Sequence, residues 1–463
     1  MTLINSISGI RGTIGGKAGE SLSPIDVVKF AAGYGTFLKT RNPEAKKIVI
    51  GRDARLSGEI INSLVCKTLQ AMGFDIVDLG LSTTPTVEMA VPMEKADGGI
   101  ILTASHNPIN WNALKLLNEK GEFISAEDGK LLNTICENNS AEFADVKKLG
   151  SYKEDSSYLQ KHIDAILALD LVDQKAIAES NFNIIVDPVN SSGTLAVPAL
   201  LKALGVTKIT LVNGDTTGNF AHNPEPLPEN LLSLTSEMKK GKYNLGIVVD
   251  PDVDRLAFMC EDGEPFGEEY TLVAVADYIL QKNGSQGLNT VSNLSSTGAL
   301  KDVTEKHHGN YYASAVGEVN VVTKMKEVNA IIGGEGNGGI ILPELHYGRD
   351  ALVGIALFLS HLAQYKKSVG FLRKSYPNYY IAKKKYDLPD VKVLETVMEK
   401  IKSKYSKNEI DTQDGVKILF DKEWVHLRPS NTEPIIRIYA ESEFETTANN
   451  LAEKLISDLK ELL

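Results

Sequence analysis

The chain has 463 residues, of which 43% are hydrophobic and 24% charged, a composition typical of globular proteins and a length that predicts about three domains. Its 49 lysines and arginines are outnumbered by 60 aspartates and glutamates, which gives a net charge of −11. This balance argues against a nucleic-acid binder or a protein that binds anionic membranes, because a basic surplus supplies the affinity in both cases, but it leaves room for a small anionic substrate held by a local cluster of arginines.

Short apolar runs of strand length alternate with amphipathic stretches through most of the chain. Continuous Ile/Val runs separated by helices indicate a parallel sheet that is covered on both faces. The pattern passes through three cycles, with strands expected at 47–51, 75–79 and 98–102, at 183–187, 208–212 and 245–249, and at 290–294, 311–314 and 330–333. Intervening helices are expected at 57–72, 193–204 and 229–239.

We interpret the three cycles as an α/β protein with three βαβαβ units, each built on a parallel or mixed sheet. The last strand of each unit runs directly into a polar loop: TASHNP at 103–108, DPDVDR at 250–255 and GEGNGG at 334–339. In open α/β sheets, ligands bind just outside the carboxyl ends of the strands. The three loops therefore predict one composite cleft between the domains.

After about residue 368 the pattern changes to that of a smaller α+β unit. It has expected helices at 394–405 and 446–463, expected strands at 415–420 and 435–440, and a further polar loop, RPSNTEP, at 428–434. We therefore predict four domains around a central cleft, at residues 1–152, 153–256, 257–368 and 369–463.

The DPDVDR loop is a candidate metal site. Asp250, Asp252 and Asp254 stand at alternate positions after a strand, so an extended loop can turn all three carboxylates toward one point. Oxygen ligands suit a hard divalent cation, and so few protein ligands favour Mg²⁺ over Ca²⁺. An EF-hand is excluded because Arg255 stands where that loop needs glycine. A charged surface turn is the alternative interpretation.

The TASHNP loop presents a small hydroxyl, Ser105, on a tight turn, because Asn107 precedes a proline and is restricted to extended backbone. A Ser/His hydrolase is not favoured, since adjacent side chains diverge in an extended loop and no GxSxG motif is present. A serine that accepts and donates phosphate instead needs a cation beside it and a separate base. A plain turn is the alternative.

Two other loops carry groups suited to a phosphorylated sugar. Arg428 to Arg437 collects two guanidinium groups, two hydroxyls and an amide, which are donors that hold a phosphate dianion. The GEGNGG loop lacks the Lys-Ser/Thr ending of a P-loop. Its carboxylate and carboxamide, Glu335 and Asn337, suit adjacent sugar hydroxyls, although a hinge or an exposed turn would also account for these loops.

The four loops in this order resemble those of the α-D-phosphohexomutase superfamily, and the resemblance covers essentially the whole chain. Supporting stretches are SGIRG at 8–12, GRDARLSG at 51–58 and FAHNPEP at 220–226. The resemblance implies reversible conversion of a hexose 6-phosphate to the 1-phosphate through a phosphoserine and a 1,6-bisphosphate. It also implies one Mg²⁺ per chain, hexose 1,6-bisphosphate as activator and a small sugar phosphate as the ligand of a monomer or homodimer.

By this resemblance, Ser105 is the phosphorylated residue and a metal ligand together with Asp250, Asp252 and Asp254, and Arg255 stabilises the transferred phosphoryl group. Lys115 is a candidate acid/base group, and His106 and Arg11 are expected in the same pocket. The remaining matches are expected to bind the substrate, namely Asn112, Glu335, Asn337, Arg428, Ser430, Asn431, Thr432 and Arg437.

The identity of the hexose depends on details of two loops. Asn337 stands where most members of the superfamily have serine, and Glu318 follows Val316-Gly317 where phosphomannomutases often carry His or Lys. The phosphoglucosamine branch tends to have an acid there, which could pair with the 2-ammonium group or simply lie in solvent. We therefore expect a phosphoglucosamine mutase, with a phosphomannomutase/phosphoglucomutase as the alternative. Ala113 replaces the usual glycine between Asn112 and Lys115.

Two rival classes follow from the same residues: a sugar phosphatase and a non-catalytic sugar-phosphate sensor. A sensor is expected to have degenerate loops, whereas these loops keep their serine, acids and arginines. The three cysteines, Cys66, Cys136 and Cys260, are too widely spaced for a CxxC pattern or a disulfide framework. With no basic leader and no apolar run of ~18 residues, the chain is expected to be soluble and cytoplasmic.

Overall fold

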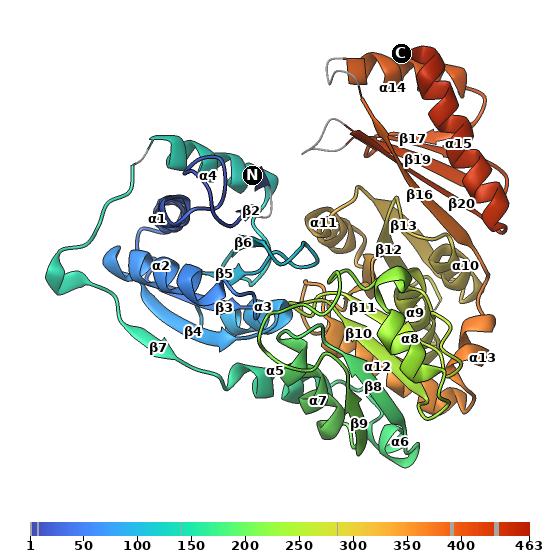
Figure 1. Ribbon diagram of the computed structural model, residues 1–463, viewed down its shortest axis with the longest axis horizontal. Coiled ribbons are helices and arrows are strands. Elements are labelled where there is room, and N and C mark those ends of the chain that lie inside the picture. The colour runs from blue at the N-terminus through green and yellow to red at the C-terminus, as the bar shows by residue number, and fades with distance from the viewer. Residues whose placement is uncertain (1, 7–8, 139, 285, 389–392, 430–434) are drawn as a thin grey trace.

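The computed structural model describes residues 2–6, 9–138, 140–284, 286–388, 393–429 and 435–463. Within these residues the chain forms four sheets, one for each predicted unit. Figure 1 shows the N-terminal unit on the left, the two middle units at the lower right and the C-terminal unit at the upper right. None of the described helices combines the length and the apolar composition that crossing a membrane requires.

The first unit is a mixed seven-stranded sheet in the order β1-β2-β6-β5-β3-β4-β7. Its strands are β1 (Leu3–Ser6), β2 (Gly9–Thr13), β3 (Lys47–Arg52), β4 (Asp75–Leu81), β5 (Gly98–Leu102), β6 (Trp111–Leu117) and β7 (Tyr152–Glu154). Its helices are α1 (Pro24–Arg41), α2 (Gly58–Ala71), α3 (Thr84–Met93) and α4 (Ala126–Asn138).

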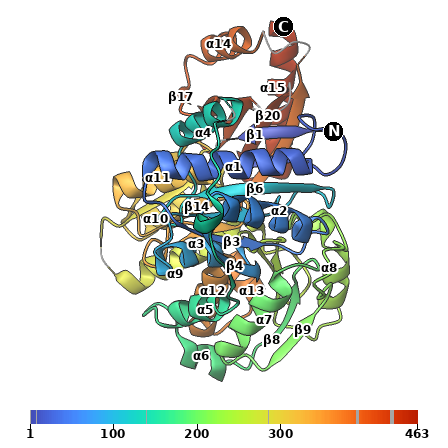
Figure 2. The ribbon, with the colours of Figure 1, turned by 90° about the vertical axis from the view of Figure 1, so that its left-hand side faces the viewer.

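Alternating side chains of the central strands bury both faces of this sheet, because successive residues of a strand point to opposite sides. Ile48 and Ile50 of β3 pack with residues of α1, α2 and α4. Val49 packs on the other face against α3 and the start of the next unit. Figure 2 views this unit from its outer side, with α1 lying across the sheet.

The second unit has the strand order β11-β10-β8-β9 and the third β13-β12-β14-β15. The second comprises α5 (Tyr158–Leu167), α6 (Gln174–Glu179), β8 (Asn183–Asp187), α7 (Gly193–Ala203), β9 (Lys208–Leu211), α8 (Leu232–Met238), β10 (Leu245–Val249) and β11 (Leu256–Met259). The third comprises α9 (Glu268–Asn283), β12 (Asn289–Asn293), α10 (Ala299–Lys306), β13 (Asn310–Ser314), α11 (Glu318–Val328), β14 (Ile332–Glu335), β15 (Gly339–Ile341), α12 (Ala351–Tyr365) and α13 (Val369–Lys374).

These two units share one hydrophobic core rather than packing as separate bodies. The core runs from α5 to the segment after α13. At its centre the rings of Phe258 from β11 and Phe358 from α12 stack with their centroids 3.8 Å apart, and Phe266 meets Phe358 edge-on at 5.2 Å. The apolar helix α12 thus belongs to the third unit by sequence but packs on α5, α6 and α7 of the second.

The fourth unit is an antiparallel sheet in the order β16-β20-β19-β18-β17, with two helices packed on it. Its elements are β16 (Tyr380–Asp387), α14 (Leu394–Lys404), β17 (Glu409–Asp411), β18 (Val416–Leu419), β19 (Trp424–Pro429), β20 (Ile435–Ser442) and α15 (Glu445–Leu462). Its core is separate from those of the other units.

The fold class predicted from the sequence is confirmed, and the predicted strands lie within two residues of the observed ones. The helix expected at 229–239 is shorter, because a 3₁₀ turn at Pro228–Asn230 precedes α8. Two predicted domain boundaries fall inside strands of the preceding sheet: residue 153 is in β7, which pairs with β4, and residue 257 is in β11, which pairs with β10. Residues 369–376 also stay with the third unit, since Val369 and Leu372 join its core.

Each of the three motif loops connects a parallel strand to a short antiparallel strand at its side. TASHNP joins β5 to β6, DPDVDR joins β10 to β11, and GEGNGG joins β14 to β15. These return strands were not predicted from the sequence. The loops are therefore hairpin connections whose polar side chains project from the carboxyl ends of the parallel strands.

Candidate active site

Arg55 of the GRDARLSG stretch holds the serine loop in place. Its side chain is buried, and its Nε donates to Asp53 Oδ2, which also accepts the Thr103 hydroxyl at 2.7 Å. The Arg55 guanidinium donates to four backbone carbonyls of the loop at 2.6–2.9 Å, those of Ser105, Asn107, Pro108 and Trp111. Ser105 itself has a φ of +48°, an unfavourable conformation for a residue with a side chain, which these contacts stabilise.

The serine hydroxyl meets the acidic loop of the second unit. Ser105 Oγ donates to Asp250 Oδ2 at 2.6 Å, across 145 residues of sequence. The other oxygen of Asp250 accepts the backbone N–H groups of Asp254 and Arg255 at 3.1 and 3.0 Å. Val253, at φ +62°, makes the tight turn that lets the acidic side chains converge. The juxtaposition that the sequence predicted between these two loops is present.

The acidic loop fits a divalent cation. Ligand atoms of Asp250, Asp252 and Asp254 all lie within 4.8 Å of one another, and the three residues are buried. Asp252 Oδ1 and Asp254 Oδ1 are buried and have no hydrogen-bond partner within the part of the chain that the structure describes, and unpaired carboxylate oxygens are costly in a protein interior. Burial and the neighbouring Asp252 and Asp254 charges also raise the pKa of Asp250. A bound cation would relieve all of these effects.

Lys115 lies on β6 against the same acids. Its Nζ is 2.7 Å from Asp252 Oδ2 and 3.1 Å from Asp254 Oδ2. Burial alone would lower the pKa of Lys115, but the two carboxylates outweigh it and raise the pKa above its ordinary value. In this arrangement Lys115 is a charged partner of the acidic loop, so it can serve as the predicted acid/base group only when those carboxylates are engaged elsewhere.

Arg349, which precedes α12, links the acidic loop to the glycine-rich loop. Its Nη2 contacts Asp254 at 2.7 Å, its Nη1 contacts Glu335 at 2.9 Å and its Nε contacts Glu318 at 3.0 Å. Glu335 is further held by the Gly317 N–H at 3.0 Å and by Asn293. The predicted sugar-binding acid is therefore fixed in place by a cation that carries three ion pairs.

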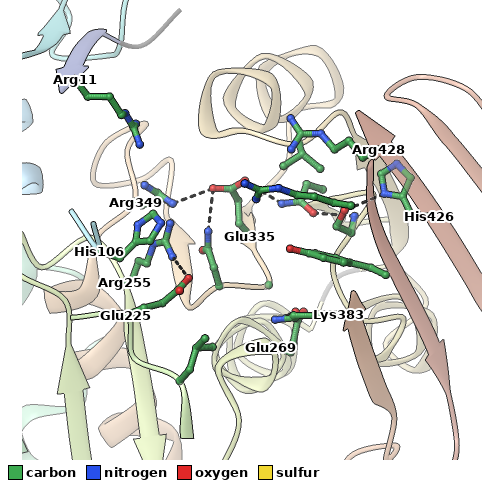
Figure 3. Close-up of a pocket in the computed structure, with 18 residues that line it drawn as sticks. Arg11, His106, Glu225, Arg255, Glu269, Glu335, Arg349, Lys383, His426 and Arg428 are labelled. Carbon is green, nitrogen blue, oxygen red and sulfur yellow. Dashed lines mark hydrogen bonds and ion pairs between the residues drawn. The ribbon is translucent and has the colours of Figure 1, made fainter. Parts of the chain in front are cut away.

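These loops surround a cavity of about 540 Å³ lined by residues of all four units. Arg11, His106, Arg255 and Arg349 lie on one side and Arg428 and His426 on the opposite side, with Glu335 between them (Figure 3). A smaller cavity of about 240 Å³ extends the space to Ser105, Lys115 and Glu318. The single composite cleft predicted from the loops is confirmed.

The side of the cavity near Ser105 is rich in donors. Arg255 pairs with Glu225 at 3.2 Å, yet its Nε is buried without a partner. Arg11 Nη1 donates to Asn107 at 3.3 Å. Burial, reinforced by the charges of Arg255 and Arg11, lowers the pKa of His106 well below its ordinary value, so that this imidazole is neutral. Such a surface can receive a phosphoryl group.

The opposite side is formed by a cross-strand pair of arginines. Arg428 of β19 stands directly opposite Arg437 of β20, and both line the cavity. Among the described residues, Arg428 Nε pairs with Asp414 at 2.7 Å, and no other side-chain partner competes there for its guanidinium. Arg428 and Arg437 belong to the phosphate clamp predicted from the sequence. The other predicted members of this clamp lie outside the described residues, namely Ser430, Asn431 and Thr432.

Models of one protein family match the chain in four consecutive segments. They are described as phosphoglucomutase/phosphomannomutase alpha/beta/alpha domains I, II and III, at residues 4–143, 160–263 and 267–380, and the C-terminal domain at 383–457. A phosphoglucomutase/phosphomannomutase of Thermococcus kodakarensis is 34% identical, with 98% of each chain covered. The chain belongs to this family.

Further comparisons agree with this membership of the phosphohexomutases. A phosphoglucosamine/phosphogalactosamine mutase of Sulfurisphaera tokodaii is 32% identical, covering 96% of this chain and 97% of its own. Among solved structures, a phosphoglucomutase/phosphomannomutase family protein from Burkholderia thailandensis superposes with a TM-score of 0.84 at 23% identity, covering 99% and 97% of the two chains. The latter likeness concerns the fold.

One predicted substrate-binding residue of this phosphohexomutase lies elsewhere. Asn112 is fully buried in β6, where Nδ2 donates to Ser57 Oγ at 2.9 Å and Oδ1 accepts the Ala113 N–H at 2.8 Å. It does not line the cavity, so its assignment as a substrate contact is wrong. Ala113 takes no turn conformation, since it lies in β6 opposite Arg11, which explains why no glycine is needed there.

Glu318 and Asn337 are both placed at the cavity, as predicted. Glu318 is almost buried at the start of α11, and burial raises its pKa to about 7 although Arg349 opposes the shift. Asn337 Oδ1 accepts the Gly339 N–H at 3.2 Å. Gly338 has a φ of +85°, and a Cβ there would lie 2.2 Å from the Leu256 carbonyl, so this glycine lets the loop lie against β11.

Three residues of the site were not predicted from the sequence: Arg349, Glu225 and Arg55. Glu225 and Arg55 stand in stretches that supported the resemblance, FAHNPEP and GRDARLSG, but their partners are distant in sequence. Arg349 had one usable signal: the pair Arg349-Asp350 directly precedes the apolar helix α12. A cation at the buried start of such a helix needs an anionic partner nearby.

Proposed function

We propose that the protein is a phosphohexomutase that interconverts the 6-phosphate and 1-phosphate of a hexose, with a phosphorylated Ser105 as donor and glucosamine phosphate as the preferred substrate. The observation that carries the proposal is the 2.6 Å contact between Ser105 Oγ of the first unit and Asp250 of the second, at one side of a cavity with an arginine pair at the other. This is the layout needed to transfer one phosphate while holding the second.

In the first half-reaction, the phosphoryl group leaves Ser105 Oγ for the free hydroxyl of a hexose monophosphate, which gives the 1,6-bisphosphate. Phosphoryl transfer depends mainly on alignment and on charge neutralisation at the transferred oxygens. Arg255, with its unpaired Nε, and neutral His106 line that side of the cavity and are in position to donate to those oxygens. Lys115 is the candidate for moving the substrate proton once a ligand engages its carboxylate partners.

Asp250, Asp252 and Asp254, together with an oxygen on Ser105, would hold one Mg²⁺. When bound, the ion supplies positive charge beside the phosphoryl group. The orphaned oxygens of Asp252 and Asp254 support this assignment, and the oxygen-only donor set favours a hard cation.

In the second half-reaction, the bisphosphate turns so that its other phosphate faces Ser105. Arg428 and Arg437 would hold the phosphate that is not reacting in both orientations, while Glu335 and Asn337 hold the sugar hydroxyls. A bisphosphate lost from the cavity leaves the serine unphosphorylated, so added hexose 1,6-bisphosphate is expected to activate the enzyme. Closure around the sugar would exclude water and limit hydrolysis.

The preference for glucosamine rests on Glu318. Its carboxylate lines the smaller cavity beside Ser105 and Lys115, where an anion can attract the 2-ammonium group of the sugar. Its pairing with Arg349 weakens this attraction, so a phosphomannomutase/phosphoglucomutase remains the second candidate. Relatives at 34% and 32% identity carry names of both kinds.

We further propose that the ligand is a free sugar phosphate rather than a nucleic acid or a membrane, that the protein acts as a monomer or homodimer, and that it works in the cytoplasm. The net charge of −11 supports the first point. Three buried, unpaired cysteines support a reducing compartment.

Replacement of the serine tests the proposal. Ser105→Ala is expected to lower mutase turnover by at least ~10³-fold, because the phosphoryl acceptor is removed. Ser63→Ala, an exposed serine on α2 of the same unit, is the matched control and is expected to keep full activity. Turnover is measured in a coupled assay with hexose 1,6-bisphosphate present. Full activity in Ser105→Ala would refute the mechanism, and release of inorganic phosphate in place of isomerisation would identify a phosphatase.

Substrate preference is tested by comparing glucosamine, glucose and mannose phosphates. We expect kcat/KM to favour glucosamine phosphate by at least tenfold, about 1.4 kcal/mol in the transition state. Glu318→Gln is expected to reduce that ratio while leaving the glucose value within a few-fold. Equal rates for the three sugars in the unaltered protein would show that Glu318 confers no preference.

A further inference from the structure

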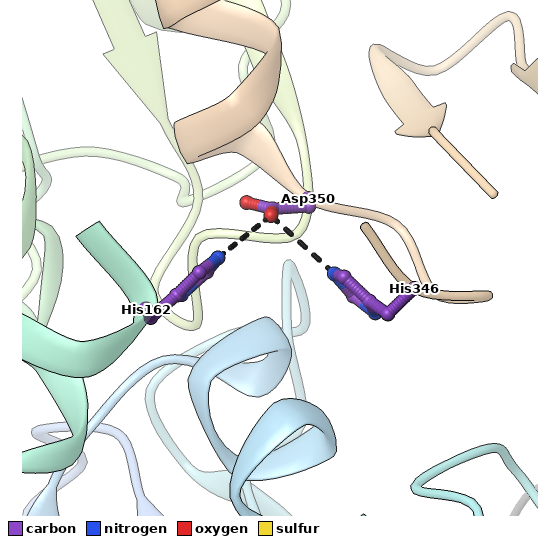
Figure 4. Close-up of side chains that lie close together, drawn as sticks. All are labelled: His162, His346 and Asp350. Atoms are coloured by element: carbon purple, nitrogen blue, oxygen red, sulfur yellow. Dashed lines mark hydrogen bonds and ion pairs between the residues drawn. The ribbon is translucent and has the colours of Figure 1, made fainter. Parts of the chain in front are cut away.

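A second group of metal-binding side chains lies outside the cavity, where the first three units meet. His162 comes from α5, and His346 and Asp350 come from the segment between β15 and α12 (Figure 4). Asp350 Oδ2 is 2.9 Å from His162 Nε2 and 3.3 Å from His346 Nε2. His162 and Asp350 are fully buried. The proposed mutase mechanism uses none of the three.

The Nδ1 atom of each imidazole, which lies away from Asp350, faces a side-chain oxygen of α3 in the first unit. His162 Nδ1 is 3.0 Å from Thr86 Oγ1, and His346 Nδ1 is 3.5 Å from Glu88 Oε2. Histidines that bind metals commonly donate their second ring N–H to such an acceptor, which fixes the ring orientation. Here the same contacts direct both Nε2 atoms toward one oxygen of Asp350.

Glu88 supplies an independent indication of a missing cation. It is 2% exposed, and neither of its carboxylate oxygens has a hydrogen-bond partner among the described residues. If His346 is neutral and carries its proton on Nδ1, that N–H can donate to Glu88. The Nε2 atom then presents a lone pair to Asp350 Oδ2. With the proton on Nε2 instead, that N–H donates to Asp350 and the Nδ1 lone pair faces Glu88 Oε2, so either neutral tautomer turns one lone pair toward a carboxyl oxygen, at 3.3 Å or 3.5 Å. A cation between Nε2 and Asp350 Oδ2 removes this conflict and lets Nδ1 donate to Glu88.

We propose that His162 Nε2, His346 Nε2 and Asp350 Oδ2 bind a divalent transition-metal ion, for which zinc is the best match. Two imidazole nitrogens and one carboxylate oxygen suit zinc, which takes such ligands at ~2.0–2.2 Å. Mg²⁺ is disfavoured because it selects oxygen ligands. The donor separations of 2.9 and 3.3 Å require only small adjustments to surround such an ion.

The site would act as a structural junction behind the acidic loop. Asp350 Oδ1 already caps α12 by accepting the N–H groups of Leu352 and Val353. The Ala351 N–H donates to the Val253 carbonyl at 3.2 Å, and Arg349 reaches Asp254. An ion bound by His162 of α5 together with His346 and Asp350 would therefore tie α5 to the segment between β15 and α12 and hold both against α3.

The metal-free rival is a cluster held by hydrogen bonds alone, with His346 between the carboxyl groups of Glu88 and Asp350. Metal content separates the two. Untagged full-length protein is dialysed against excess Mg²⁺, which occupies the acidic loop, with a low concentration of zinc, and retained zinc is measured by mass spectrometry. We expect about one zinc per chain in the unaltered protein. We expect none in His162→Gln or His346→Gln, and full retention in the control His307→Gln, whose partner is Asp277.

The acidic loop is the competing location, and cobalt distinguishes it. Four-coordinate Co²⁺ bound through two imidazoles gives strong visible absorption bands, whereas Co²⁺ in an octahedral oxygen-only site absorbs only weakly. We expect these bands in the unaltered protein and in Asp252→Asn, but not in His346→Gln. Zinc retained by both histidine variants, or lost from Asp252→Asn alone, would overturn the proposal without bearing on the mutase assignment.

If the histidine variants do not fold, zinc binding can still be tested with the unaltered protein. After treatment with a chelator and return of Mg²⁺, addition of zinc is expected to raise the midpoint of thermal unfolding, because an ion that binds only the folded chain stabilises it. No stoichiometric zinc and no shift in the midpoint would overturn the proposal and establish a metal-free, hydrogen-bonded cluster instead.

Discussion

Arg349 is the residue on which the geometry of the site most depends. Its three nitrogens each contact a different carboxylate, from the acidic loop, from the glycine-rich loop and from the start of α11. Lysine can place a charge there but cannot reproduce three fixed directions. Removing one partner of a buried ion pair also leaves the other charge uncompensated.

We therefore expect Arg349→Lys to reduce kcat/KM by ~10²-fold, which corresponds to about 3 kcal/mol. The measurement is steady-state kinetics with any accepted hexose phosphate. Arg41→Lys, at an exposed pair with Asp128, is the control and should behave as the unaltered protein. Unchanged kinetics in Arg349→Lys would show that the three contacts do not set the geometry.

Glu269, at the start of α9, makes the stability of the folded protein depend on pH. Burial raises its pKa to about 8, although Lys383 opposes the shift. Between the ordinary value of 4.5 and about 8 the folded chain holds a proton that the unfolded chain has released. Stability is therefore lost as the pH rises through this window, and below it the residue contributes nothing.

Glu269→Gln keeps the shape of the protonated side chain at every pH. We expect it to match the unaltered protein in free energy of unfolding at pH 5 and to exceed it by of order 2–4 kcal/mol at pH 8. Urea unfolding across this range makes the comparison. A difference that is constant with pH would mean that Glu269 does not titrate in the window.

At the scale of elements, the carboxyl ends of the parallel strands could be predicted from sequence, and with them the position of the three motif loops. Each of these strands is a continuous apolar run followed by a sharp change to polar residues. The return strands could not be predicted, because β11 and β15 span only 4 and 3 residues and β6 reads WNALKLL without regular alternation. Their pairing depends on strands already in place.

The same distinction applies to the side chains of the site. The roles of Ser105 and the three aspartates can be predicted from their spacing within short sequence motifs. Arg349 and Glu225 acquire their roles only through partners 95 and 30 residues away. Asn112 has the expected position in the sequence motif, but β6 directs its side chain toward Ser57 and away from the cavity. This is why it was assigned wrongly. Local sequence patterns thus identify the loops of the site, whereas the direction in which a side chain points depends on the register between β2 and β6.

The β19–β20 hairpin makes a testable element of the phosphate clamp. Its cross-strand arginines present two guanidinium groups on one face of the sheet. Arg437→Gln is expected to raise KM for the hexose phosphate ~10–50-fold, since a charge-assisted contact contributes about 1.5–3 kcal/mol, with a smaller change in kcat. Lys384→Gln, which contacts Glu453 of α15 away from the cavity, is the control. An unchanged KM would remove this hairpin from substrate binding.

At the scale of the whole molecule, the second and third units form a common base to which the first and fourth units are attached. The second and third units share one core, which fixes the acidic loop relative to the glycine-rich loop. The fourth unit has its own core and meets the base through polar contacts such as Lys417 to the Leu294 carbonyl at 2.7 Å and Ser295 to His426 at 2.9 Å. Interfaces of this polar kind permit relative motion, so the clamp is the part expected to move when substrate binds.

The shared core predicts that the second and third units unfold together. Phe358 lies at its centre, stacked on Phe258 and beside Phe266. Phe358→Ala is expected to cost ~3–5 kcal/mol through the cavity that it leaves. Because hydrogen exchange reports the stability of each cooperative unit, the amides of β8 and β10 should lose as much protection as those of β12 and β14, while β18 to β20 keep theirs. Val425→Ala, in the core of the fourth unit, should show the opposite pattern. Loss of protection confined to β12 and β14 in Phe358→Ala would show that the two units are held separately.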